Sequence, residues 1–522
     1  MKRYYMTIVL SLFCLGMVTA QTLYDGIEFS NKNLSGTARF VGMGGAMGAL
    51  GGDISTIGSN PAGLGIYRSN DVMTSFSFSS HEIETTYGGN KFTNNRNRGG
   101  FDNFGFVFSS QIGNDALRFL NFGFNYNRAK TFYRTREMSG DMGGSQIDQM
   151  ITQANNMYDA GVDIGSLNPN KSRYANDYVG WLGAIGYESF LFDPADDGCY
   201  DRYWEGLPIG HFYSKEWGGI DQYDFNVSMN FVDRVYFGVS VGAYDLNYKK
   251  YSFYGENLFH AGATSSDEFY DLHSTKWIDG AGVDFKLGLI VRPFEGSPFR
   301  FGIAFHSPTY YKLTLGTEAS LYSEMITEDE EGNWGITSDF INTADDVGRK
   351  ESDFKLQTPW KVNLSLGHTI GSQLALGAEY EYQNNSNIKF KYADGVSITH
   401  ANGLVNDFAK GVHTLRLGAE YNVIPQFAFR VGYNFSTASV KKEAFKDLAI
   451  NSIETDTDYA NAEALNRFTV GMGYRGRSFY ADLGYQFNHY KEKFYAFDNK
   501  YLDSAESTNS RSHVVMTLGF RF

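Results

Sequence analysis

The sequence is poor in cysteine, poor in proline and short of positive charge, and each shortage excludes a class of protein. Its 522 residues include 2 cysteines and 9 prolines, and the net charge is −14. Cys14 lies in an N-terminal apolar run, so removal of that run leaves Cys199 alone and excludes an internal disulfide or a cysteine-based metal site. The acidic balance disfavours nucleic-acid binding, which requires a basic surface. We therefore expect no metal, no cofactor and no nucleic-acid partner.

Long apolar runs are also missing beyond the N-terminus. Lys2 and Arg3 precede an apolar run over residues 6–18, and small residues follow up to Ala20. This order is typical of a signal peptide, which we predict at residues 1–20. No later segment reaches the roughly 18 apolar residues that a membrane helix needs. The mature chain is thus predicted to be either soluble or a membrane β-barrel.

Glycine and aromatic residues are abundant instead, with 58 Gly, 36 Tyr and 43 Phe. Many segments alternate in character, as in "FAFRVGYNF" over residues 427–435. There Phe427, Phe429 and Val431 share one face, while Ala428 and Arg430 share the other. A period of two predicts strands with one apolar face.

The alternating segments are joined by tight turns and by long polar stretches such as 134–220 and 441–463. Short turns at one end and long loops at the other are typical of an outer-membrane barrel. The turns at 113–115 and 233–234 belong to the same end, so an even number of strands separates them and 178–192 is assigned to a loop. We predict fourteen antiparallel strands, near residues 71–80, 101–111, 117–133, 221–232, 235–252, 277–292, 298–316, 353–370, 373–391, 410–422, 427–440, 464–475, 478–494 and 511–522.

The predicted outer loop at about 134–220 has a helical pattern of its own. Ile147, Met150, Ile151, Ala154 and Met157 recur at helical spacing. We therefore expect a partly helical, partly apolar extracellular prong within this loop.

The chain ends inside an alternating segment that carries Phe520 and Phe522 on its apolar face. A soluble β-sandwich is the alternative fold, but so many long strands would make an unusually large sandwich. A terminal aromatic residue resembles the assembly signal of bacterial outer-membrane barrels. We expect a monomer that meets outer-membrane lipids and, during biogenesis, the barrel-assembly machinery.

The small-residue stretch over residues 42–65 raises the question of a phosphate-binding loop. A dinucleotide fingerprint fails because Met47 stands where its last glycine is required, and a P-loop fails because no lysine is near. The stretch instead resembles the N-terminal segment of the FadL/TodX outer-membrane transport proteins. The resemblance rests on Ala38-Arg39, on the Gly-Met-Gly-Gly-Ala of residues 42–46, on Asp53 and on the Asn-Pro-Ala-Gly-Leu of residues 60–64.

This resemblance implies a fourteen-stranded barrel in the outer membrane of a Gram-negative bacterium. It implies a hatch, or plug, at residues 21–70 inside a barrel of residues 71–522. It also implies passive uptake of hydrophobic molecules, fatty-acid-like or aromatic, with release through a wall opening near the third strand.

The hatch residues suit a plug that packs closely. Gly and Ala allow the backbone to approach the wall and to take unusual dihedral angles, whereas Pro stiffens a turn and Asn bonds the backbone beside it. Asp53 is expected to accept from buried amides. Whether the segment shifts when ligand binds or is a static plug stays open. The candidate residues are Gly42, Gly44, Gly45, Asp53, Asn60, Pro61 and Ala62.

Inward-facing charges are a second group of candidates. Glu420 and Arg430 fall opposite each other across a turn, and Arg416 points inward nearby. We interpret them as a wall network that anchors the hatch. Lys249 and Lys250 are candidates for contact with a ligand carboxylate, and Gly123 is a candidate for the lateral opening, because a mid-strand glycine suggests a bulge.

Three functions remain in view. Uptake of hydrophobic molecules, with movement of the hatch, is the first. A receptor for a hydrophobic ligand such as a porphyrin on the same scaffold is the second, and an outer-membrane hydrolase is the third. No catalytic residues are proposed, because no catalytic set is evident and the family is one of transporters.

Overall fold

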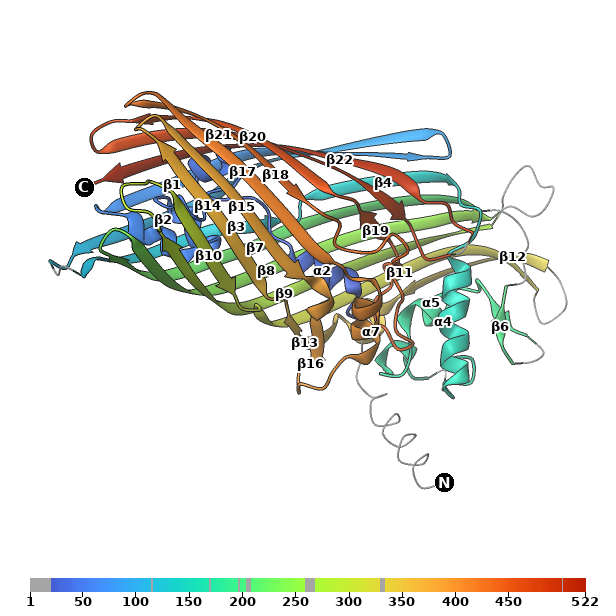
Figure 1. Ribbon diagram of the computed structural model, residues 1–522. Coiled ribbons are helices and arrows are strands. Elements are labelled where there is room, and N and C mark those ends of the chain that lie inside the picture. Colours follow the sequence, from blue (N-terminus) through green and yellow to red (C-terminus); the bar gives the residue numbers. More distant parts are fainter. Residues whose placement is uncertain are drawn as a thin grey trace.

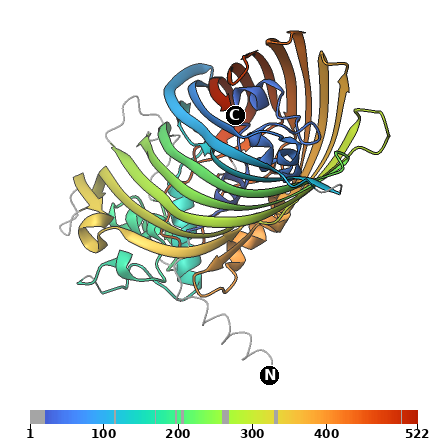
Figure 2. The same ribbon diagram turned by 90° about the vertical axis from the view of Figure 1, so that its left-hand side faces the viewer.

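A closed antiparallel β-barrel surrounds an N-terminal plug in the computed structural model (Figures 1 and 2). The structure describes residues 20–522 except 114–115, 169, 196–197, 203–207, 259–267, 329–333 and 500. The predicted signal peptide, apart from Ala20, lies outside the described residues. Backbone pairing runs from each strand to the next and closes between β1 and β22.

The barrel has the fourteen predicted wall strands, four of which are interrupted. Pro308 and Pro359 lie at two of the breaks, where a residue without an N–H group cannot continue a ladder. The wall strands, with broken ones joined, are β1 (Asp71–Tyr87), β2 (Asn90–Gln111), β3 (Leu117–Thr131) with β4 (Arg134–Asp141), β7 (Ile209–Phe231), β8 (Val235–Leu258), β9 (Glu268–Val291), β10 (Arg300–His306) with β11 (Tyr310–Glu328), β13 (Lys350–Gln357) with β14 (Lys361–Ile370), β15 (Leu374–Asn384) with β16 (Lys389–Tyr392), β17 (Gly411–Ile424), β18 (Phe427–Ser436), β20 (Leu465–Arg475), β21 (Phe479–Tyr495) and β22 (Ala505–Arg521).

The predicted alternation is confirmed, and it separates a lipid-facing surface from the lumen. In β18, Phe429 and Val431 are 53% and 56% exposed, whereas Arg430 between them is 1% exposed. Phe520 and Phe522 lie on the same outer surface, at 50% and 62% exposure. The apolar face therefore points to the membrane and the small or charged face points inward.

Several strands are longer than the sequence predicted. β1 and β2 form one hairpin that turns at Gly88-Gly89, although residues 81–100 carry no apolar alternation. β4 continues the third strand and β7 begins at Ile209, so the predicted loop of 134–220 shrinks to residues 142–208. The outward face of the β1–β2 extension is polar, which is consistent with strands that leave the membrane, so the apolar outward pattern could not reveal it. The inward faces of the extensions bury apolar side chains, among them Ile83, Met138 and Phe212.

Most of the remaining elements lie toward one end of the barrel, where Figure 1 labels α4, α5, β6 and β12, and the N-terminal elements lie inside it. The outer prong contains the predicted helix, and Ile147, Met150, Ala154 and Met157 are its buried apolar residues. Among the described residues, no helix is long and apolar enough to cross a membrane. The elements outside the wall are α4 (Ile147–Asp159), η3 (Arg173–Ala175), α5 (Trp181–Glu188), β5 (Asp193–Pro194), β6 (Tyr200–Asp201), β12 (Trp334–Asn342), α6 (Thr343–Val347), η4 (Asn385–Asn387), α7 (Thr399–Phe408) and β19 (Tyr459–Ala462).

The N-terminal segment occupies the lumen, as the blue ribbon in Figure 2 shows. Its elements are short because each is bounded by glycine or by a capping side chain, and they are α2 (Leu23–Ser30), α3 (Ala38–Gly42), η1 (Ile54–Gly58) and η2 (Pro61–Ile66). We call residues 20–70 the hatch.

Candidate functional site

The hatch fills the barrel because glycines on the wall meet glycines on the hatch. A Cβ atom at Gly432 of β18 would collide with the backbone of Met43 and Gly44, and one at Gly418 of β17 would collide with Met43. Gly44 itself has φ 63°, a conformation that favours glycine. The two backbones are therefore in direct contact, which leaves no room for solute between them at these positions.

The other hatch candidates cap and brace the plug. Asp53 accepts hydrogen bonds from the Ser55 amide at 3.0 Å and from the Thr37 hydroxyl at 2.8 Å. Asn60 accepts from the Ala62 amide at 3.1 Å, and the Pro61 carbonyl accepts from Ser228 of β7 at 2.8 Å. The structure thus places these residues at the two turns that fix the hatch to itself and to the wall.

The predicted wall network exists, but it contains a hatch residue that sequence reasoning missed. Arg39 binds both carboxylate oxygens of Glu420, at 2.8 and 2.9 Å, and Arg430 donates to Glu420 at 2.6 Å. Arg430 also pairs with Asp482 at 2.6 Å. Arg416 does not join this network.

Arg416 belongs to a separate group that lies farther from the turn at residues 423–426. There it pairs with Glu379 and, at 3.0 Å, with Glu381. The strand register separates the two groups, since Arg416 and Glu420 lie four residues apart along β17. The hatch is therefore tied to the wall by one charged network, with a second one above it.

Above the hatch lies a cavity of about 410 Å³ that mixes aromatic and charged side chains. Tyr24, Ile27, Phe40 and Phe132 contribute apolar surface, and α2 forms one of its sides. Charged and uncharged polar residues line most of the rest, so the cavity offers both an apolar and a polar contact to one ligand.

Four cations that line this cavity have no carboxylate within ion-pair distance among the residues that the structure describes. Lys32 donates to Tyr244 at 2.7 Å and to Gln222 at 3.3 Å, and Lys361 donates to the Ser30 carbonyl at 3.4 Å. Burial lowers the pKa of Lys32 to about 7. The four residues are Lys32, Lys361, Arg467 and Arg511.

Lys249 and Lys250 do not act as a pair. Lys249 lies on the outward face of β8 opposite Trp217 and Trp277, whereas Lys250 is buried and faces the lumen. The period of two sends neighbouring side chains to opposite faces. Lys250 is also already paired, which leaves neither lysine free for a ligand carboxylate in this structure.

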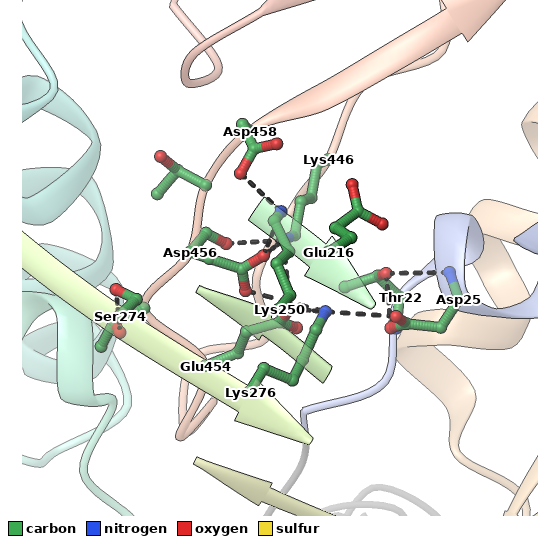
Figure 3. Close-up of polar contacts among 12 residues, drawn as sticks. Thr22, Asp25, Glu216, Lys250, Ser274, Lys276, Lys446, Glu454, Asp456 and Asp458 are labelled. Carbon is green, nitrogen blue, oxygen red and sulfur yellow. Dashed lines mark hydrogen bonds and ion pairs between the residues drawn. The ribbon is translucent and has the colours of Figure 1, made fainter. Parts of the chain in front are cut away.

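Lys250 is part of a buried ion cluster that the sequence did not indicate (Figure 3). Its ammonium group lies 2.6 Å from Asp456 and 2.6 Å from Asp458. Residues 441–463 were predicted as an outer polar loop, but the acidic part of this segment turns into the lumen and becomes buried. We call residues 437–458 the inner loop, and the lysine cluster consists of Lys250, Lys276, Lys446, Asp25, Glu454, Asp456 and Asp458.

Backbone pairing in the wall is interrupted between the second and third strands, but not at Gly123. Gly123 lies in a continuous ladder with Val107 and Asn226, and its inward face meets Leu64 of the hatch. Among the described residues, pairing between β2 and β3 stops at Asn103 and Asn127, so the rest of β2 pairs only with β1. The glycine serves close packing here rather than a bulge.

Side chains bridge this gap, which we call the seam. Arg98 donates to Thr131 at 3.3 Å and its guanidinium lies 4.0 Å from the Tyr133 ring centroid. Phe101 and Asp102 line a small pocket just inside. The cavity and the seam are both bordered by Thr131, so a path between them is short.

A closed barrel with a lipid-facing apolar belt, an internal hatch and a mixed cavity defines an outer-membrane transport barrel. A family model described as outer membrane protein transport protein (OMPP1/FadL/TodX) matches residues 230–511. The chain belongs to this family, whose members reside in the outer membrane of Gram-negative bacteria.

Solved structures with the same fold are distant in sequence. The deltaS2 mutant of the monoaromatic hydrocarbon channel TodX has a TM-score of 0.50 at 12% identity, over 94% of this chain and 100% of that one. A FadL homologue of Pseudomonas aeruginosa gives 0.49 at 13%, over 94% and 98%, and the toluene transporter TodX of Pseudomonas putida gives 0.47 at 12%, over 94% and 100%. A search of curated protein sequences finds no match.

Proposed function

We propose that this protein takes up hydrophobic molecules with an anionic head group by passive passage through the barrel. The observation that carries the proposal is the cavity above the hatch, where aromatic side chains face cations without carboxylate partners. A carboxylate would supply the missing partner for Lys32 and Lys361, and the apolar part of the ligand would cover Tyr24 and Phe132. The charge-assisted hydrogen bonds so formed are stronger than neutral ones.

Lys32 and Lys361 replace Lys249 and Lys250 as candidate contacts of the ligand carboxylate. A receptor that binds the same ligand without passing it on is the second candidate, since the cavity alone would serve both. Cellular uptake of a labelled fatty acid separates the two, because a receptor would bind the label without raising its rate of entry.

The seam is the proposed exit into the membrane. Its location between β2 and β3 supports this proposal, because the family resemblance implies an opening near the third strand and no β2–β3 backbone pairing would have to break there for a ligand to pass. A photoreactive amino acid at Phe101 should cross-link to a bound tritiated fatty acid.

Phe122 supplies the matched control for this experiment. It is 47% exposed on the outer face of β3, close to the 44% of Phe101, but it lies within the intact ladder. Equal labelling at both positions would mean that the ligand reaches them from the bulk membrane, and the seam would lose its role.

Hatch movement is proposed for residues 20–36 and not for residues 38–66. α2 is held by the apolar side chains Leu23 and Phe29 and by polar contacts, including Asp25 with Lys276 and Glu28 with Lys130. Residues 38–66 are instead locked by backbone contact with wall glycines. Polar contacts can be exchanged for water or ligand, whereas a close-packed backbone has no such substitute.

Hydrogen exchange should therefore show ligand-dependent protection that is confined to residues 20–36. We expect amides of α2 to change their exchange rate when a fatty acid is added, while amides of residues 38–66 stay protected in both states. A static plug would leave the exchange rates of both groups unchanged. A change spread over the whole hatch would show that the movement is not confined to residues 20–36.

A further inference from the structure

The inner loop crosses the lumen from one wall of the barrel to the opposite wall. It follows β18, the eleventh wall strand, and leads by way of β19 to β20, the twelfth wall strand. Its acidic residues meet Lys250 of β8 and Lys276 of β9, the fifth and sixth strands. Four strands of the fourteen-stranded ring separate these pairs on one side and six on the other, so the loop spans the barrel near its diameter. Figure 3 shows the charged side chains at which it meets β8 and β9.

The loop also roofs the cavity on the side away from residues 38–66. Lys446, Asp456 and Asp458 belong both to the loop and to the cavity lining. Asp25 of α2 reaches Lys276 at 3.2 Å, so the hatch and the loop share one lysine. A ligand that comes from the outer, long-loop end of the barrel has to pass this roof.

The contacts that close the roof against β8 and β9 are of a polar, exchangeable kind, whereas elsewhere the loop is fixed by the Trp181 amide, which donates to the Ser452 carbonyl at 2.9 Å, and by the buried Ile453. All of residues 437–458 are described, and apart from isolated bridges the segment has neither helix nor strand. It is joined to β8 and β9 by ammonium–carboxylate pairs and by one hydroxyl pair, Ser274 with Thr455, at 2.7 Å. Burial of such ions costs hydration, so separating them in a wet lumen returns water to both partners. Separating an apolar contact of the same size would bring no such gain in hydration.

From this geometry we infer that the inner loop is a lid, which the lysine cluster holds shut and which must leave β8 and β9 before a ligand enters the cavity. The inference rests on the proposed function, because it describes how the same cavity is reached. The release of Lys276 from Glu454 would also loosen Asp25, so lid opening and movement of α2 are coupled through one side chain.

A reversible cross-link tests the lid. Ser274→Cys with Thr455→Cys places two thiols where the hydroxyl oxygens lie 2.7 Å apart, in a chain that also carries Cys199→Ser. Thr85→Cys with Ser507→Cys is the matched control, because these residues face each other on β1 and β22, with oxygens 3.4 Å apart, and lie away from the loop. Both variants are expressed in cells that lack their own channel, and uptake of a labelled fatty acid is measured with and without dithiothreitol.

We expect oxidation to reduce uptake by the Ser274–Thr455 pair to the level of cells without the protein, with full recovery after reduction. The control pair should transport equally in both states. Complete cross-linking with unchanged uptake would overturn the lid. The reduced form reports on the proposed function separately, since absent uptake in every state would refute the channel and not the lid alone.

If the cysteine pair does not assemble, Thr455→Cys alone gives a second measurement. Thr455 is 1% exposed in the closed lid. Its thiol should react slowly with a membrane-impermeant maleimide on intact cells, because the lid opens. Complete protection over the time needed for uptake would contradict the inference.

Discussion

Replacing Gly432 with valine should expel the hatch from its seat and make the barrel leaky. A Cβ atom at this position overlaps Gly44 N and the Met43 carbonyl carbon, and the hydroxyl of Thr469 closes the third side. Overpacking costs about 1–3 kcal/mol where side chains can shift. Here the opposing atoms are backbone, so we expect a cost at or above the upper end of that range.

Two measurements follow this change. Limited proteolysis should cut residues 38–66 in the Gly432→Val protein while the barrel keeps its heat-modifiable mobility, and cells should admit a bulky polar antibiotic. Gly99→Val is the control, because the nearest atom to its Cβ position is Ser77 O at 3.9 Å. A hatch that stays protected in Gly432→Val would show that the plug is not seated by this contact.

Loss of both Lys32 and Lys361 should weaken binding of a fatty acid by at least about tenfold. Each charge-assisted hydrogen bond contributes about 1.5–3 kcal/mol, and about 1.4 kcal/mol corresponds to a factor of ten. The Lys32→Met, Lys361→Met protein should bind the alcohol of the same chain length as tightly as the wild type does. Titration with a fluorescent ligand measures both affinities.

Lys91→Met is the control for general effects of charge, since the exposed Lys91 lies on the β1–β2 hairpin and pairs with the half-buried Glu84. Equal weakening for acid and alcohol would indicate lost packing and not a carboxylate site. No weakening for either ligand would remove these lysines from the site.

The same site predicts a pH dependence. Burial lowers the pKa of Lys32 to about 7, and Lys361, Lys286, Asp224 and Asp284 are the charged groups that act on it. The ammonium form that a carboxylate needs prevails below this pKa. Affinity for the acid should therefore fall as the pH rises from about 6 to about 8.5, and this fall should be absent for the alcohol.

Alternation along the chain was sufficient to predict the barrel. The apolar face repeats wherever a strand meets lipid, and the parity of the turns gave the number of strands. The same signal disappears in the β1–β2 hairpin beyond residue 80, because the outward face of an extension outside the membrane meets water and is polar, although Ile83 and Tyr87 stay buried on the other face. Strand ends are therefore the part of the wall that the pattern could not locate.

The candidate site was harder to predict, because its members come from distant segments. Glu420 and Arg430 are neighbours across a turn, which made their contact predictable, but Arg39 reaches Glu420 across 381 positions of sequence. The inner loop was mistaken for an outer loop because buried ion pairs and solvated charges have the same composition. "IETDTDY" over residues 453–459, an acidic segment facing two inward lysines, is the only trace that the sequence holds of the lysine cluster.

Uptake by whole cells tests the central claim most directly. Cells of a Gram-negative strain without its own channel for hydrophobic compounds would express either the wild-type protein or the Lys32→Met, Lys361→Met variant, and folded barrel would be quantified in the outer membrane. The account predicts saturable uptake of a labelled fatty acid above that of cells without the protein, with a lower rate for the variant at low ligand concentration. Uptake equal to that of cells without the protein, with folded wild-type barrel present, would contradict it.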